Sequence, residues 1–388
     1  MVVIIALVFV VVLAAVAAFH WWAWRRLVRD ALPRGSVWRR VATGVLVAGP
    51  VLMVAAPLSE RAEAPYWLVR VVSWPGFVWM AVCVYLLLAL LAGEVVRPLL
   101  RRWLARRDAG PVPEETAVTR RVFVSRVVGG ATVAAVAGTV GYGAHSLFSG
   151  PRVLDVTVPL AKLPRSADGF RIAVVSDIHV GPLLGRGFTQ HVVDTINATS
   201  PDLVAVVGDL VDGDVEDLAP AVAPLAGLRS RHGTFFVTGN HEYISGAGQW
   251  VGHVRTLGMR LLANERVELP GFDLAGVNDV RAGEGEGPDF AKALGGRDPA
   301  RAAVLLAHQP IVIDQAVAHG VDLQLSGHTH GGQFWPGHLV VDGIQHTLAG
   351  LTRHGGTQLY VTRGAGAWGP PVRVGAPPDI TVVRLASL

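Results

Sequence analysis

The stretch SGHTHGGQ, from Ser326 to Gln333, places His328 and His330 one residue apart among glycines, directly after the apolar run VDLQL. In an extended segment, residues i and i+2 point to the same side, so this spacing predicts two imidazole rings facing one spot at the end of a strand. Such a pair suits a metal ion. A glycine-rich turn with two solvated histidines is the simpler explanation for so short a motif, and the rest of the chain must decide.

Composition limits where such a site could lie. The chain has 388 residues, of which 51% are hydrophobic and 16% are charged, so it is more apolar than an average soluble protein. The first 150 residues contain four apolar segments without Asp, Glu, Lys or Arg, each close to the roughly 20 residues that a membrane-crossing helix needs. We therefore predict that residues 1–150 form a membrane region with about four transmembrane helices. The segments are Val2 to Trp24, Val41 to Leu58, Val71 to Gly93 and Val127 to Phe148, and the last could instead be a buried helix or a linker.

The arginines are distributed unevenly between the loops of this region. The loop between the second and third apolar segments has only Arg61 and Arg70, whereas the loops before the second segment and after the third are rich in arginine. The positive-inside rule makes such arginine-rich loops cytoplasmic. This predicts a multi-pass protein of the cell membrane whose chain after about Ser149 lies on the extracytoplasmic side. We expect membrane lipids as partners of the basic loops, and no nucleic acid, because topology explains the net charge of +4. The arginines are Arg25, Arg26, Arg29, Arg34, Arg39 and Arg40 in one loop, and Arg97, Arg101, Arg102, Arg106, Arg107, Arg120, Arg121 and Arg126 in the other.

Residues 151–388 have the size and pattern of one α/β domain. Short apolar runs alternate there with glycine, proline and two helical stretches, Gly187 to Ser200 and Glu216 to Arg229. Several runs are continuously apolar, which is typical of strands buried on both faces. The single cysteine, Cys83, lies in the third apolar segment, so any metal in this domain must be held by nitrogen and oxygen. The predicted strands are FRIAVVSD, DLVAVVGD, GTFFVTGN, FDLAGVND, AAVLLAHQ, VDLQLSGH, TQLYVTRG and ITVVRL.

Metal-ligating residue types follow five of these strands. A sheet fixes the spacing of side chains at its strand ends, while the loops leave a bound metal open to substrate. Imidazole and carboxylate together suit Mn, Zn or Fe, and a carboxylate such as Asp209 can bridge two ions. One ion would need three or four groups, so the sequence predicts two sites. The groups are Asp177 and His179 in SDIHVG, Asp209 in GDLVDG, Asn240 in GNHEY, His308 in AHQP, and His328 and His330 in the opening motif.

In this order, the motifs DxH, GDxxD, GNHE, an isolated histidine and GHTHGGQ resemble those of the calcineurin-like metallophosphoesterase superfamily, over about Asp155 to Leu388. The ending TRGAGAWGPPVRVGAPPDI resembles its bacterial branch of membrane-attached or exported members. The resemblance implies an α/β fold, a four-layer sandwich of two β-sheets flanked by helices. It also implies two divalent metal ions, one held by Asp177, His179 and His330, the other by Asn240, His308 and His328, with Asp209 bridging them.

The resemblance further implies that His241 is catalytic and faces the phosphate without binding a metal. Its neighbour Glu242 is expected to orient other groups, and Asp212 is expected to shape the turn in GDLVDG. Five aromatic or histidine side chains in the loops beyond the metal motif could face substrate or simply be exposed. These are Trp335, His338, His346, His354 and Trp368.

The predicted chemistry is hydrolysis of a phosphoester or pyrophosphate bond. Two cations about 3.5–4 Å apart can activate a water for in-line attack on phosphorus. A Ser or Cys nucleophile is disfavoured, because residues 151–388 contain no cysteine and no G-x-S-x-G motif. We therefore predict a membrane-anchored phosphoesterase, with a lipid-linked phosphate among its candidate substrates. The alternative is a non-catalytic membrane sensor or scaffold that binds metal through the hydrolase fold.

Overall fold

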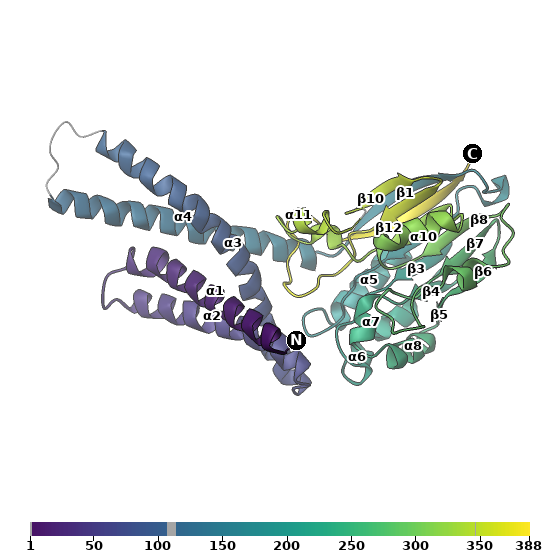
Figure 1. The fold of residues 1–388 in the computed structure, drawn as a ribbon, viewed down its shortest axis with the longest axis horizontal. Coiled ribbons are helices and arrows are strands. Elements are labelled where there is room, and N and C mark those ends of the chain that lie inside the picture. The colour runs from purple at the N-terminus through teal and green to yellow at the C-terminus, as the bar shows by residue number, and fades with distance from the viewer. Residues whose placement is uncertain (1, 107–113, 346) are drawn as a thin grey trace. The chain divides into compact units, whose positions relative to one another are not determined.

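A computed structural model describes residues 2–106, 114–345 and 347–388 of the chain (Figure 1). The chain divides into two compact units, Met1–Tyr142 and Gly143–Leu388. The first unit is helical, and the second contains both β-sheets.

The four apolar segments form long helices, three of them wholly within the first unit. These helices are long and apolar enough to cross a membrane, so the predicted long apolar helices are present. Two of them contain internal prolines, Pro50 and Pro57 in one and Pro75 and Pro98 in the other, which membrane helices tolerate. The elements are α1 (Val2–Trp24), the π-helical turn η1 (Arg25–Arg29), α2 (Val37–Arg61), α3 (Tyr66–Ala105) and α4 (Glu114–Phe148), and the last residues of α4, from Gly143, belong to the second unit.

Polar contacts within the first unit link α1 and η1 to α3. The Arg26 guanidinium donates to the Glu94 carboxylate at 2.6 Å, and the Trp79 indole N–H donates to His20 Nε2 at 3.1 Å. Pairing between helices is the usual way in which polar side chains are accommodated in apolar helical bundles.

The first sheet of the second unit has the strand order β1-β12-β2-β3-β4-β5. Its central strands are almost entirely apolar and buried, which is typical of strands covered on both faces. Strands β2, β3, β4 and β5 run parallel, and β12 pairs antiparallel with β2 and parallel with β1. The strands are β1 (Arg152–Leu160), β2 (Arg171–Val175), β3 (Leu203–Val207), β4 (Thr234–Val237), β5 (Met259–Leu261) and β12 (Asp379–Ser387).

The second sheet has the order β10-β11-β9-β8-β7-β6. The four inner strands, β7, β8, β9 and β11, run parallel to one another. The outer strand β6 pairs antiparallel with β7, and the outer strand β10 pairs antiparallel with β11. The strands are β6 (Glu265–Leu269), β7 (Phe272–Gly276), β8 (Ala302–Leu306), β9 (Leu323–Ser326), β10 (Gly350–His354) and β11 (Thr357–Val361).

The main hydrophobic core lies between the two sheets. It combines residues such as Ile172 and Leu203 of the first sheet with Leu274, Val304 and Leu325 of the second, all fully buried. A second cluster packs α9 and α10 onto the other face of the second sheet, through Phe290 and Ile313. In Figure 1, α5, α6 and α8 lie beside the strands of the first sheet. The two sheets flanked by helices confirm the predicted fold class. The helices are α5 (Arg186–Ala198), α6 (Val215–Val222), α7 (Asn240–Ile244), α8 (Ala247–Thr256), α9 (Phe290–Leu294), α10 (Ile313–Ala318) and α11 (His338–Val341), with short 3₁₀ turns η2 (Arg165–Ala167), η3 (Ala223–Gly227), η4 (Pro310–Val312) and η5 (His330–Gly332).

Candidate metal centre

The predicted ligands follow the carboxyl ends of parallel strands. In the first sheet, β2 leads into Asp177 and His179, β3 into Asp209, and β4 into Asn240 at the start of α7. In the second sheet, β8 leads into His308, and β9 into His328 and His330. Parallel neighbours end at the same edge of a sheet, so the topology brings these loops together.

Five of the seven predicted ligands have a left-handed backbone. The φ angles are 54° at Asp177, 49° at His179, 51° at Asp209, 70° at His328 and 51° at His330. This conformation costs a residue other than glycine about 1–3 kcal/mol and is concentrated at functional sites. It also corrects the expectation that His328 and His330 lie in an extended segment, because β9 ends at Ser326 and both histidines are in the tight turn after it. Their rings consequently join different clusters.

The first cluster consists of Asp177, His179 and His330. One potential ligand atom from each lies within 4.8 Å of the others. The Nε2 atoms of His179 and His330 are 3.1 Å apart, and His330 Nε2 is 3.4 Å from Asp177 Oδ1. Two nitrogens bound to one ion at about 2.1 Å, roughly at right angles, would be about 3 Å apart. The donor set therefore fits a divalent cation.

The second cluster consists of Asp209, His308 and His328, with Asn240 beside them. Ligand atoms of the first three lie within 4.8 Å of one another, and Asn240 Oδ1 is 3.2 Å from His308 Nε2. Asp209 Oδ2 lies 3.1 Å from His308 Nε2 and 3.8 Å from His179 Nε2, so one carboxylate oxygen faces both clusters. This placement fits a bridging ligand.

The glycine before Asp209 is required by this close packing. Gly208 has a φ of +79°, and a Cβ there would lie 2.7 Å from His308 Nδ1 and from the Gly239 backbone. Only glycine combines that backbone angle with so little space.

Two of the ligand imidazoles, those of His308 and His179, donate from their other ring nitrogen to a fixed acceptor. His308 Nδ1 bonds the Val207 carbonyl at 2.8 Å, and His179 Nδ1 bonds the Asp212 carboxylate at 3.0 Å. Such contacts fix the tautomer and leave Nε2 facing the cluster. Asp177 is held differently, because it accepts the backbone N–H of His328 at 3.0 Å.

Asp212 contacts two histidines of the site, which the sequence analysis did not foresee because it assigned this side chain to the turn. Its carboxylate contacts His179 Nδ1 and also His241 Nδ1, the latter at 2.6 Å. Burial would raise the pKa of Asp212, but the charge of His179 and its hydrogen bond outweigh burial and lower that pKa. The recurrence of aspartate in GDLVDG was the available signal.

His241 lies at the edge of both clusters. Its ring packs edge-on against His179, with centroids 4.7 Å apart, and its backbone N–H donates to Asp209 Oδ1 at 2.8 Å. Because Asp212 holds Nδ1, Nε2 is the nitrogen left to contact another group. His241, His179 and Asp212 also have potential ligand atoms within 4.8 Å of one another.

Glu242 and Arg373 support the clusters from buried positions. Glu242 accepts the backbone N–H groups of Asp209, Leu210 and Gly239 at 2.6–3.0 Å, in agreement with its expected orienting role. Burial, reinforced by Asp209, raises the pKa of Glu242 to about 7. Arg373 was missed by the sequence analysis. Its guanidinium donates to the His330 carbonyl at 2.7 Å and lies 3.1 Å from His330 Nδ1.

The electrostatics of the clusters favour a cation. Burial and then His308 lower the pKa of His328 to about 3, and burial and then Arg373 lower the pKa of His330; these shifts favour neutral imidazole, the form that binds metal. Burial alone would lower the pKa of His179, but the charge and hydrogen bond of Asp212 have the larger effect and raise that pKa to about 9. The surrounding carboxylates therefore attract positive charge to the position that a divalent ion would take.

Other residues from the sequence analysis lie outside these clusters. His354 is on β10, where its Nε2 is 3.2 Å from Thr352 Oγ1, and His338 begins α11. His346 is not among the described residues. Trp335 and Trp368 are 52% and 58% exposed, and the Trp368 ring lies 5.7 Å from that of His241.

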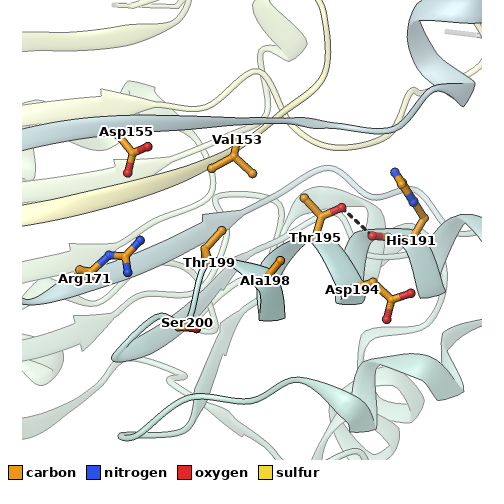
Figure 2. Close-up of a pocket in the computed structure, with 9 residues that line it drawn as sticks. All are labelled: Val153, Asp155, Arg171, His191, Asp194, Thr195, Ala198, Thr199 and Ser200. Carbon is orange, nitrogen blue, oxygen red and sulfur yellow. Dashed lines mark hydrogen bonds between the residues drawn. The ribbon is translucent and has the colours of Figure 1, made fainter.

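A separate groove of about 720 Å³ lies between β1, β2 and α5 (Figure 2). It includes Asp155, Arg171, His191 and Asp194 but none of the predicted ligands. The metal centre is therefore not part of this groove.

Comparison with known proteins agrees with the geometry. Residues 170–332 match the family model described as calcineurin-like phosphoesterase. The chain is 42% identical over 239 residues to an uncharacterized metallophosphoesterase of Helicobacter pylori, which covers 61% of this chain and 64% of that protein. It is 35% identical over 316 residues to the transmembrane protein with metallophosphoesterase domain of Bos taurus, covering 77% of this chain and 70% of that protein. A Bacillus subtilis relative, the uncharacterized metallophosphoesterase YkuE, is 30% identical and covers 70% of this chain and 98% of its own length.

The chain thus spans about 64% of the length of the Helicobacter pylori relative, and more of the other two. The matched range, residues 170–332, includes every residue of both clusters. The chain belongs to the calcineurin-like phosphoesterase family.

Proposed function

We propose that this protein is a membrane-anchored phosphoesterase that hydrolyses a phosphoester or pyrophosphate bond at a binuclear metal centre. The observation that carries the proposal is the pair of clusters on either side of Asp209 Oδ2, with His241 beside them. Asp177, His179 and His330 would hold one divalent ion, and Asn240, His308 and His328 the other. When bound, Mn, Zn or Fe ions would supply Lewis acidity and lower the pKa of a coordinated water.

His241 would serve the substrate. Asp212 holds Nδ1 at 2.6 Å and stabilises a positive charge on the ring, so Nε2–H can donate to an oxygen of the phosphate. As a water oxygen bonds to phosphorus and the bond from phosphorus to the leaving oxygen breaks, the Nε2 proton of His241 would pass to the leaving oxygen. The same N–H can instead stabilise charge on the phosphoryl oxygens.

The chain's other buried groups would keep this arrangement rigid. Glu242 fixes the backbone at Asp209, and Arg373 fixes that at His330, so the ligands are positioned before substrate binds. We further propose that this unit acts on the extracytoplasmic side, since the arginine-rich loops favour that topology.

Hydrolysis by the full-length protein tests the proposal. The protein would be purified in detergent, stripped of metal, and assayed on a nitrophenyl monoester, a bis-nitrophenyl diester and a nucleotide sugar, with and without added Mn, Zn or Fe. We expect metal-dependent turnover of at least one substrate and almost none from the matched variant Asp209→Asn. If the wild-type protein binds two metals but turns over no more substrate than Asp209→Asn, the sensor or scaffold alternative is supported instead.

A further inference from the structure

An exposed apolar segment follows the metal motif directly. Between Trp335 and Ile344, four large apolar side chains face outward: Trp335 is 52% exposed, Leu339 67%, Val340 66% and Ile344 65%. Single exposed apolar residues are ordinary on protein surfaces, but several in one short segment indicate an interaction site. The segment includes α11 and carries one acidic residue, Asp342.

Backbone and side-chain contacts hold this segment in place. The Trp335 N–H donates to the Val374 carbonyl at 2.8 Å, and the Gln333 amide donates to the Trp368 carbonyl at 2.8 Å. Trp335 is five residues after His330, so their Cα atoms are at most about 18 Å apart. The Trp335 end of the segment therefore lies near the candidate metal centre on a fixed base.

The residues that anchor this segment also anchor the end of a membrane helix. The Arg373 N–H donates to the Gly143 carbonyl at 2.9 Å, and Gly143 packs closely against Val372 and Val374. One turn later in α4, Leu147 is fully buried in a cluster with Leu184 and Ala367. All of these residues belong to the second unit, and α4 is one of the helices long and apolar enough to cross a membrane.

We infer that the Trp335–Ile344 segment docks on the lipid bilayer and inserts its apolar side chains at the interface. The bilayer is the favoured partner because the segment is tied to the end of α4. Val374 bonds Trp335 in the segment, and Val372 and Arg373, next to it in sequence, contact Gly143 of α4, a helix that could cross the membrane. Tryptophan is also a preferred residue at that depth. If the proposed phosphoesterase function holds, this docking would bring the metal centre to a phosphate or pyrophosphate on a lipid headgroup.

Depth-dependent quenching tests the docking without requiring any activity. In a Cys83→Ser background, Leu339→Cys or Val340→Cys would be labelled with a fluorophore and the full chain reconstituted in phosphatidylcholine–phosphatidylglycerol vesicles carrying nitroxide lipids. The matched control is Arg231→Cys, an exposed site just before β4, whose opposite end leads to Asn240. We expect quenching at 339 and 340 and none at 231. Equal quenching at all three positions, or none at 339 and 340, would overturn the docking.

A second experiment tests the substrate class. The double variant Leu339→Asp with Val340→Asp should lose roughly tenfold or more in kcat/KM on a phosphorylated lipid in vesicles, and keep its rate on a soluble nitrophenyl ester. Quenching together with equal rates on the lipid would leave the docking standing and reject the lipid substrate. A wild-type protein that hydrolyses neither substrate would contradict the proposed function, while the quenching result would still decide the docking.

Discussion

Replacing Asp212 with asparagine should impair both the metal centre and His241, because one carboxylate contacts both rings. The Asp212 side chain is 25% exposed and lies 3.0 Å from His179 Nδ1 and 2.6 Å from His241 Nδ1. Asparagine keeps the size of the side chain and one acceptor oxygen but removes the charge. The change therefore weakens two interactions without opening a cavity.

The size of the effect follows from the charge on these hydrogen bonds. A hydrogen bond to a charged group contributes about 1.5–3 kcal/mol, and roughly half of that depends on the charge. Losing the charge at both rings should then cost about 1.5–3 kcal/mol, which is a decrease of about 10- to 100-fold in kcat/KM. Part of the decrease should appear as weaker metal binding, since outer contacts of ligand histidines affect metal affinity.

The assay is steady-state hydrolysis of a nitrophenyl diester by the full-length protein over a metal titration. In a His241→Ala background, Asp212→Asn should cost only the His179 contribution, about 3- to 10-fold, so the two changes should not be additive. Asp217→Asn, an exposed carboxylate on α6, is the control and should stay within about twofold of wild type. Full additivity, or an Asp212→Asn protein with normal rates at limiting metal, would refute the link through Asp212.

Three further predictions concern the bridge, the proton donor and the topology. Asp209→Asn should lower turnover more than His330→Ala, because Asp209 faces both clusters; an unchanged content of two metals with near-normal rates would reject bridging. His241→Ala should keep both metals and lose roughly 10²–10⁴ in turnover, with a smaller loss on good leaving groups such as nitrophenolate, and a lost metal would make His241 a ligand. An alkaline phosphatase fused after Leu388 should be active, whereas activity of a cytoplasm-only reporter there would overturn the topology.

The sequence predicted the central strands and missed the outer ones, for a physical reason. All eight predicted strands are interior members of the two sheets, where both faces are buried and the apolar runs are continuous. The four strands that were not predicted, β1, β5, β6 and β10, are the edges of the two sheets. Edge strands face solvent on one side, so their residues alternate or are polar, as in GLTRH of β10.

The site was predictable in residue type but not in geometry. Ligand identity follows from chemistry at strand ends, and the structure gathers all seven residues into two neighbouring clusters. The left-handed turn at His328 and His330 could not be inferred, because the spacing alone favours an extended segment. Contacts across long sequence separations, such as that of Arg373 with His330, depend on packing that no local pattern encodes.

The position of β12 has a consequence for biosynthesis. This strand lies between β1 and β2, yet it is synthesised after every other strand of both sheets. During translation β1 has no neighbour in its sheet and one edge of β2 stays open until the last strand has been synthesised. A nascent chain that stopped before Asp379 would lack β12, an interior strand of the first sheet. The edges of β1 and β2 that pair with β12 in the finished protein would then be exposed to chaperones and proteases.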